Sequence, residues 1–195
     1  MKSVLISIQP KWCELIANGK KTVEVRKTKP KLETPFKVYI YCTKGETIYL
    51  PRDIFGKNAL NGKVIGEFVC KETTKIKYDT PYSKGFGGFD IRFNIDIKKT
   101  CLTEDEICEY LGEPTDMDRG EFHPIFETKG FAWHISDLVI YDKPKELNEF
   151  KSVSNYARKL RTEFFGKDPC CVNDYKLTRP PQSWCYVERS DNNGE

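Results

Sequence analysis

Three chargeable side chains of complementary types are concentrated near the N-terminal end of this 195-residue chain. Glu24 and Arg26 stand two residues apart and alternate with Val23 and Val25, a pattern typical of a β-strand with one polar and one apolar face. Lys21 comes where the preceding loop becomes this strand, and its long stem can carry its ammonium group to the polar face. Charged groups turned toward a protein interior are costly unless they pair with one another or meet a ligand. The segment is therefore a candidate site.

Each residue type in this segment has a definite chemistry. Arg26 can hold Glu24 in its ionised form, or it can bind a planar or phosphate group through two parallel hydrogen bonds. Lys21 can act as a point charge for phosphate or, once desolvated, as a base, and Glu24 can act as a general base toward water or toward the hydroxyl of Thr22. A surface ladder of Lys, Glu and Arg between neighbouring strands would have the same composition.

Short strands and helices must position this segment. An apolar run at 4–8 predicts a buried strand, and Pro10 with Gly19 predicts a short helix over 10–18 that turns Trp12, Cys13 and Ile16 toward the core. The candidate strand itself covers 22–27. Further strands are predicted over 36–42, 63–71, 132–140 and 184–188. Several strands with short helices between them favour an α+β fold with a barrel-like sheet and helical covers.

Residues 73–122 are predicted to be an inserted strand-helix segment. Apolar and polar residues alternate strictly over 89–98, which predicts a long strand. Thr103 and Glu106 form a capping box, so a helix is expected over 104–111 with Gly112 as its stop. We expect one domain over 1–150, with a C-terminal helix capped by Ser152 and a tail, 151–195, packed on that domain.

Composition and cysteine usage exclude several protein classes. No run approaches 18 apolar residues, and the N-terminal apolar stretch is too short for a signal peptide, so we expect neither a membrane span nor secretion. The expected compartment is the cytoplasm. The eight cysteines contain no C-x-x-C pair and are predicted to be thiols, with a zinc site at Cys42, Cys170, Cys171 and Cys185 as the less favoured alternative. We expect no metal and no cofactor.

The charge is distributed unevenly along the chain. The net charge is only +3, but residues 1–44 hold ten Lys or Arg against three Asp or Glu. A basic surface of this kind suits a phosphate-bearing partner. The opposite excess lies at 101–121, which is rich in carboxylates and is typical of a solvated face. The basic surface would be supplied by Lys2, Lys11, Lys20, Lys27, Lys29 and Lys31.

The same segment resembles a known family. Gly19, Lys21, Glu24 and Arg26 match the pattern G-x-K-x-x-E-x-R, and they follow the run Ser-Ile-Gln-Pro-Lys-Trp at 7–12, as at the start of an ASCH domain of the PUA-like superfamily. Segments 39–42, 62–68 and 130–134 also resemble strands of that family. The resemblance implies a small PUA-like β-barrel with a cleft lined by the motif. It also implies binding of RNA or nucleotides.

Some bacterial relatives in this family are enzymes, one branch resembling an amidohydrolase of N4-acetylcytidine and another a ribonuclease. In the amidohydrolase branch a Thr stands at the position of Glu24 and serves as nucleophile beside a Lys that matches Lys21. This chain instead has Glu24 there and Thr22 two residues earlier, so the resemblance does not carry that mechanism over unchanged.

Our leading hypothesis is an ASCH-type domain that binds RNA or a nucleotide. Lys21, Glu24 and Arg26 would face a base or phosphate, and the aromatic residues Trp12, Trp133 and Trp184 are candidates for a stacking wall or for the core. The remaining candidate binding residues are Gln9, Lys11 and His134. The alternatives are a metal-independent hydrolase of RNA or an acylated nucleoside, using Lys21, Glu24 and Thr22, and a protein-interaction module that uses the acidic 101–121. The oligomeric state is open.

Overall fold

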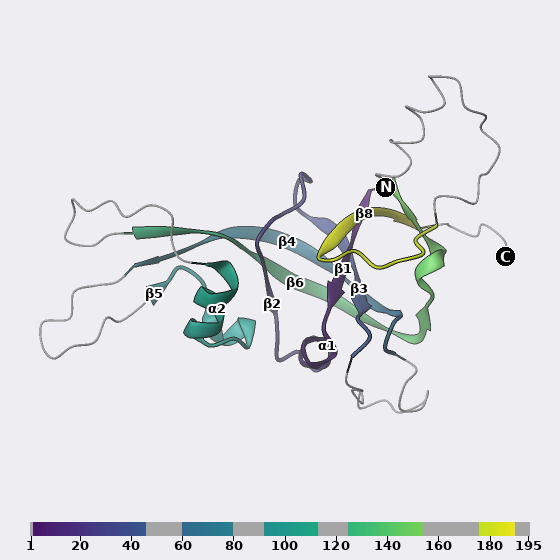
Figure 1. The fold of residues 1–195 in the computed structure, drawn as a ribbon, viewed down its shortest axis with the longest axis horizontal. Helices are drawn as coiled ribbons and strands as arrows, with labels where there is room; N and C mark the ends of the chain where they lie inside the picture. Colours follow the sequence, from purple (N-terminus) through teal and green to yellow (C-terminus); the bar gives the residue numbers. More distant parts are fainter. Residues whose placement is uncertain (1, 46–59, 80–91, 113–124, 154–175, 190–195) are drawn as a thin grey trace, which may run out of the picture. The chain divides into compact units, whose positions relative to one another are not determined.

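The computed structural model describes residues 2–45, 60–79, 92–112, 125–153 and 176–189, and these form a mostly-sheet α+β fold (Figure 1). Within these ranges lie two α-helices, α1 (Pro10–Ala17) and α2 (Glu104–Leu111), and two 3₁₀-helices, η1 (Ile97–Thr100) and η2 (Leu147–Glu149). The strands are β1 (Ser3–Ile8), β2 (Val23–Arg26), β3 (Phe36–Cys42), β4 (Val64–Asp79), β5 (Arg92–Phe93), β6 (Ile125–Lys145), β7 (Phe150–Ser152) and β8 (Trp184–Arg189).

The chain divides into two compact units. The first unit comprises Met1–Ala17, Phe36–Val69 and Asp137–Glu195, and the second comprises Asn18–Pro35 and Cys70–Ser136. The long strands β4 and β6 each run from one unit into the other. The motif strand β2 and the predicted insertion therefore share the second unit.

In the first unit, strand β1 has partners on both sides. It pairs in parallel with β3 and antiparallel with β8 (Figure 1). Strand β8 also pairs antiparallel with β7. All six residues of β1 are buried, including Ser3 and Ser7, and the predicted apolar run Val4-Leu5-Ile6 lies at the centre of the strand. The adjoining core contains Leu5, Tyr39, Tyr41, Val64, Phe150, Leu177 and Val187.

In the second unit, β2 pairs antiparallel with β6, and the two-residue strand β5 pairs with the end of β4. One apolar cluster joins β2, β4, β6 and α2. Its buried members are Val23, Val25, Ile76, Ile107, Leu111 and Ala132. The apolar face predicted from the alternation in β2 is therefore present, and Ile107 and Leu111 of helix α2 pack in the same cluster as its valines.

Helix α2 begins and ends where the sequence predicts. The hydroxyl of Thr103 accepts a hydrogen bond from the backbone N–H of Glu106, and the Glu106 carboxylate accepts one from the N–H of Thr103. The helix turns Leu111 toward β6 at Gly130, where an added Cβ would lie 2.5 Å from both Leu111 methyl carbons. Gly130 thus permits the close approach of helix and strand.

The strand predicted over 89–98 is wrong beyond Phe93. In the described part of 89–98 the strand is confined to Arg92–Phe93, and a 3₁₀-helix begins at Ile97, because the side chain of Asp96 caps that helix by accepting from the N–H of Lys98. The alternation still separates exposed from half-buried side chains over 92–97. Residues 73–79, assigned to the insertion, continue strand β4.

The remaining predicted elements agree with the structure where it describes them. The strands at 36–42 and 184–188 are present, whereas those at 63–71 and 132–140 are parts of the longer β4 and β6. The hydrogen-bonded order β2-β6-β4-β3-β1-β8-β7 is open among the described residues, so a closed barrel is not confirmed. Ser152 is the last residue of β7, and the helix predicted after it lies outside the described residues.

The six cysteines in the described ranges are free thiols, as predicted. Cys13, Cys42 and Cys70 are buried, and burial raises the pKa of Cys70 to about 12 and that of Cys185 to about 11. Cys170 and Cys171, which the zinc alternative required, lie outside the described residues. No described helix combines the length and the apolar character that a membrane crossing requires.

Candidate functional site

The pairing of β2 with β6 decides which motif side chains share a face. Glu24 lies opposite Trp133 and Arg26 lies opposite Phe131 in the antiparallel register. Directly opposed residues of an antiparallel pair project to the same side of the sheet, and residues two apart do so along each strand. These four side chains therefore occupy one face, with the two motif charges beside two aromatic rings.

The charged side chains of the motif form one connected ionic group, which we call the Glu24 group (Lys21, Glu24 and Arg26). The Nζ of Lys21 lies 3.3 Å from Oε2 of Glu24, and an Nη atom of Arg26 lies 2.9 Å from Oε1. Each carboxylate oxygen thus contacts a different cation. The three side chains have a formal charge of +1 and are buried, with relative exposures of 2%, 6% and 8%.

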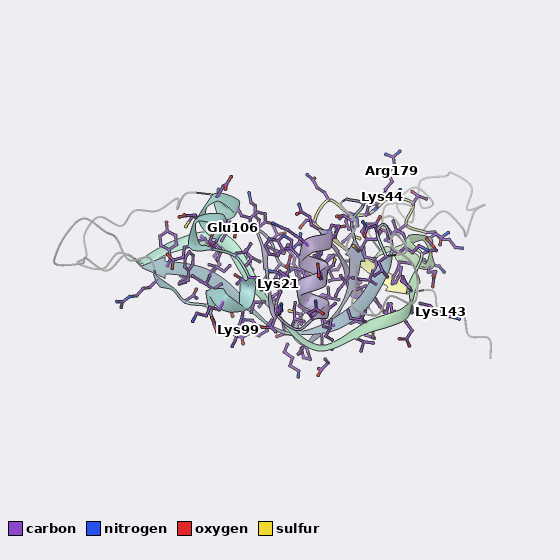
Figure 2. The ribbon with its side chains drawn as sticks, turned by 90° about the horizontal axis from the view of Figure 1, so that it is seen from below. Lys21, Lys44, Lys99, Glu106, Lys143 and Arg179 are labelled. Carbon is purple, nitrogen blue, oxygen red and sulfur yellow. The ribbon has the colours of Figure 1, made fainter. Side chains whose placement is uncertain are left out.

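The 3₁₀-helix η1 contributes a fourth contact residue, Thr100, to the Glu24 group. The Nζ of Lys21 donates a 2.6 Å hydrogen bond to the backbone carbonyl of Thr100, the last residue of η1. The backbone N–H of Thr22 also donates to the carbonyl of Lys99, at 3.0 Å. Lys21 consequently lies in the interior of the second unit, whereas Lys99 and Glu106 are exposed (Figure 2). The end of η1 fixes where the Lys21 ammonium sits.

Several local contacts hold Thr100 in position. Its hydroxyl donates to the carbonyl of Ile97 at 2.7 Å and accepts from the N–H of Leu102 at 3.1 Å. The next residue, Cys101, has a left-handed backbone with φ of 56°, which ends η1 sharply. A contact made by a backbone carbonyl does not depend on residue type, so the amino-acid sequence does not indicate that Thr100 binds Lys21. Only the placement of η1 reveals this contact.

The predicted residue His134 lies on the other face of the sheet. It is opposite Val23 in the register, and its Nε2 lies 2.9 Å from the hydroxyl oxygen of Thr74 on β4. The structure therefore brings Lys21, Glu24 and Arg26 together but does not bring His134 to their face. The hydroxyl of Thr74 gives His134 a partner of its own.

The other predicted binding residues lie in the first unit. Gln9 precedes helix α1, and its backbone carbonyl accepts from the N–H groups of Trp12 and Cys13, each at 3.0 Å. Lys11 is exposed, with its Nζ 4.2 Å from the centre of the half-buried Trp12 ring. These contacts explain how the first turn of α1 is ordered. The binding roles of Gln9, Lys11 and Trp12 remain predictions.

The lysines predicted to form a basic surface are exposed, whereas the aromatic candidates are buried or half-buried. All six lysines assigned to that surface are exposed: Lys2, Lys11, Lys20, Lys27, Lys29 and Lys31. Trp133 is completely buried, which matches its alternative role in the core, and Trp184 is half-buried with its ring 5.3 Å from that of Tyr186. Phe131, which the sequence analysis did not single out, is the half-buried aromatic residue opposite Arg26.

The chemistry available at the Glu24 group is that of charge-assisted hydrogen bonding. Arginine and lysine offer donors to phosphate or to a base edge, and the carboxylate offers an acceptor to an N–H of a base. Among the described residues there is no group of three or more His, Cys, Asp or Glu with the geometry of a metal site.

Comparison with protein families gives one match. Residues 6–89 match the model of the ASCH domain family, so the resemblance seen in the motif is confirmed over a segment that includes the end of β1 and all of α1, β2, β3 and β4. No curated protein matches the chain.

Solved structures of ASCH proteins also align with the chain. The ASCH protein from Zymomonas mobilis has 18% sequence identity and a TM-score of 0.48, over 95% of this chain and 87% of that one. A single-substitution variant of the same protein aligns with 18% identity and a TM-score of 0.49, over 96% of this chain and 91% of that one.

Proposed function

We propose that this chain, whose residues 6–89 match the ASCH domain family, binds RNA or a nucleotide through the Glu24 group. One observation carries the proposal: the motif's Lys21, Glu24 and Arg26 form a single buried ionic group on one sheet face. ASCH domains are generally linked to RNA binding, and a group of this composition has the donors and the acceptor that such a ligand needs.

The composition of the group matches a nucleotide well. A guanidinium carries five N–H donors, more than one carboxylate oxygen can accept, so Arg26 can hold Glu24 and a phosphate or base edge simultaneously. Glu24 can accept from a base N–H while its other lone pairs stay on the cations. A base edge that offers both donors and acceptors would thus contact Glu24 and Arg26 together.

Burial of the group also favours a binding role over a purely structural one. Replacing a buried ion pair by well-packed apolar residues is often neutral or stabilising, so such a group is weak as a device for stability. The neighbouring positions Val23 and Val25 show that this strand accommodates apolar residues. We infer that three charged residues are placed here for recognition.

The proposal is tested by substituting Arg26 and measuring RNA binding by fluorescence anisotropy across a salt series. Arg26→Lys keeps the charge but loses the planar fork, and Arg26→Gln loses both. We expect Arg26→Gln to weaken binding about tenfold or more, which corresponds to about 1.4 kcal/mol, and Arg26→Lys to fall in between. Lys37→Gln, an exposed position on β3, is the matched control and should bind like the wild type.

Thermal unfolding of each variant separates lost binding from lost folding. The proposal is overturned if folded Arg26→Gln and Arg26→Lys proteins bind RNA and free nucleotides as the wild type does. It is also overturned if wild-type binding is absent at low salt. Binding that does not change with salt would remove phosphate from the ligand's contacts.

A hydrolase is the second candidate, and the contact between Lys21 and Glu24 favours it, since a buried amine and carboxylate 3.3 Å apart could assist attack by water. Both oxygens of Glu24 already contact cations, which fits a bridging carboxylate better than a free base, so we rank binding first. Mass spectrometry of RNA and acylated nucleosides after incubation, with and without chelator, tests for turnover. Product that persists with chelator and disappears in Lys21→Ala would establish the hydrolase.

The protein-interaction alternative is tested by the same binding and turnover experiments. Glu104, Asp105, Glu106 and Glu109 are exposed on α2 and could meet a basic partner. A protein that shows neither binding nor product would favour this alternative. We retain the small PUA-like barrel as the architecture proposed from the family match.

A further inference from the structure

Phe131 combines two properties that occur together in no other described aromatic residue of the second unit. It lies opposite Arg26 in the β2–β6 register, so its ring shares the face of the Glu24 group. Its side chain is half-buried, so part of the ring remains accessible. Its neighbour on that face, Trp133, is completely buried and offers no surface for stacking.

Two lysines from different elements converge on the Phe131 ring. The Nζ of Lys75 on β4 lies 4.7 Å from the ring centre, and the Nζ of Lys29, in the segment after β2, lies 5.4 Å from it. These separations are typical of cation–π contacts. Lys29 is exposed and Lys75 is half-buried. An accessible aromatic ring flanked by two cations therefore adjoins the position of Arg26.

We propose that Phe131 is a stacking platform for a base of single-stranded RNA, with Lys29 and Lys75 binding the phosphates on either side of that base. This inference rests on the proposed function, because it extends the ligand from the Glu24 group onto Phe131. It makes the ligand a strand of several nucleotides rather than one nucleotide. The surface formed by Phe131, Lys29 and Lys75 is the Phe131 platform.

A base can replace the two lysines at the Phe131 ring when RNA binds. A lysine beside an exposed ring gains less than a base gains by stacking on the same ring. The long lysine stems let each ammonium move to a phosphate when the base arrives, so their attraction is transferred rather than lost. A duplex hides its base faces, whereas a single strand presents them, and this selects a single strand as the ligand.

Tyr110 on α2 provides a matched comparison within the same unit. It is 39% exposed, and the Nζ of Lys27 lies 5.3 Å from its ring centre. Like Phe131, Tyr110 is an accessible ring with a lysine nearby, but it is not paired with a motif residue in the β2–β6 register. A general affinity of aromatic and basic surface for RNA would involve Tyr110 equally.

The test uses the full chain and a fluorescein-labelled 12-nucleotide oligouridylate, with an abasic strand of the same length as the second probe. We expect Phe131→Leu to weaken oligouridylate binding about tenfold, and Phe131→Tyr, which keeps a stacking ring, to stay within about twofold of the wild type. The abasic strand should bind the wild type and Phe131→Leu equally. Tyr110→Leu should leave both affinities unchanged.

The lysines are tested by the salt dependence of binding. Lys29→Gln and Lys75→Gln should each lower the slope of log K against log salt concentration by about 0.7, the contribution of one phosphate contact on a single strand. Unchanged slopes in both variants would overturn the phosphate part of the proposal. Both positions are at the surface or half-buried, so folded protein is expected and is checked by thermal unfolding.

Failure of this inference and failure of the proposed function give different results. If the wild type binds oligouridylate and Arg26→Gln weakens it, while Phe131→Leu binds normally, only the Phe131 platform is wrong. If uridine monophosphate binds as tightly as the 12-mer, the ligand is a single nucleotide and the platform is also wrong. If the wild type binds neither probe, both proposals fail together with the RNA assignment. Should Phe131→Leu not fold, the two probes on the wild type still test stacking, because equal affinities for oligouridylate and for the abasic strand would overturn it.

Discussion

Two carboxylates in this molecule each connect two partners, but they differ in how far they are buried. Glu24 in the second unit contacts Lys21 and Arg26, and its side chain is 7% exposed. Glu67 in the first unit contacts Lys37 at 2.7 Å and accepts a hydrogen bond from Tyr141, with exposures of 20% for Glu67 and 45% for Lys37. A carboxylate that bridges two partners thus occurs once in a fully buried group and once in a partly exposed one.

The difference teaches what burial does to an ionic group. Water and counterions screen the exposed pair, so breaking it has little effect on folding. Burial weakens this screening at the Glu24 group, and removing its carboxylate would leave two buried cations facing one another. The residue types alone do not distinguish these cases, and only the packing around each carboxylate does.

The largest expected effect follows from removing the buried negative charge. Glu24→Gln keeps the shape of the side chain but leaves Lys21 and Arg26 without their carboxylate. We expect the free energy of unfolding to fall by about 3–5 kcal/mol, the cost typical of breaking a buried pair. Urea unfolding followed by circular dichroism measures this change, with two probes to check whether the two units unfold together.

A loss below about 1 kcal/mol in Glu24→Gln would contradict the comparison, because it would mean that the Glu24 group is screened like the surface pair. In the double variant Glu24→Gln with Lys21→Met, part of the lost stability should return. That partial recovery would identify charge repulsion as the cause.

The next effect tests whether α2 is an integral part of the unit that holds the Glu24 group. Gly130→Ala places a Cβ 2.5 Å from two methyl carbons of Leu111, so helix and strand must separate slightly. We expect a loss of about 1–3 kcal/mol by urea unfolding, as for other overpacked cores. Gly45→Ala is the matched control, since its Cβ would meet Pro10 at an ordinary 3.5 Å. Equal stabilities of the two variants would show that Leu111 rearranges freely.

The sequence predicted the local parts of this arrangement well. The capping box at Thr103 and Glu106 is decided by residues three apart, so no tertiary information was needed to place α2. The alternation in β2 also predicted that Glu24 and Arg26 share a face. Both predictions depend on contacts between near neighbours in the chain.

What could not be predicted depends mainly on contacts between distant segments. The Thr100 carbonyl reaches Lys21 across 79 residues of sequence, and a carbonyl carries no residue-type signal. The position of His134 on the far face depends on the β2–β6 register, which the sequence does not contain. The strand predicted over 89–98 was wrong for a local reason, because Asp96 caps a 3₁₀-helix and interrupts an alternation that otherwise favours a strand.

Substitution of the half-buried Glu67 is expected to have a smaller effect on stability than substitution of Glu24. Glu67→Gln removes the pair with Lys37 but leaves an amide that still accepts from Tyr141. We expect a loss of about 0–1 kcal/mol in urea unfolding, because Lys37 is nearly half exposed. A loss as large as that of Glu24→Gln would show that burial does not separate the two groups.

The smallest expected effect is the pH dependence of the stabilisation that Glu67 contributes. Burial raises the pKa of Glu67, but the hydrogen bonds from Lys37 and Tyr141 outweigh it, so this pKa lies below its usual value of 4.5. The unfolded chain therefore binds a proton to Glu67 before the folded protein does. The stabilisation is complete above the unfolded pKa and is lost as pH falls through the folded one. The stability difference between wild type and Glu67→Gln should accordingly stay constant from about pH 8 to about pH 5 and shrink below that. A difference that grows as the solution is acidified would mean that burial, rather than Lys37 and Tyr141, controls this carboxylate, and the contrast with Glu24 would then need another cause.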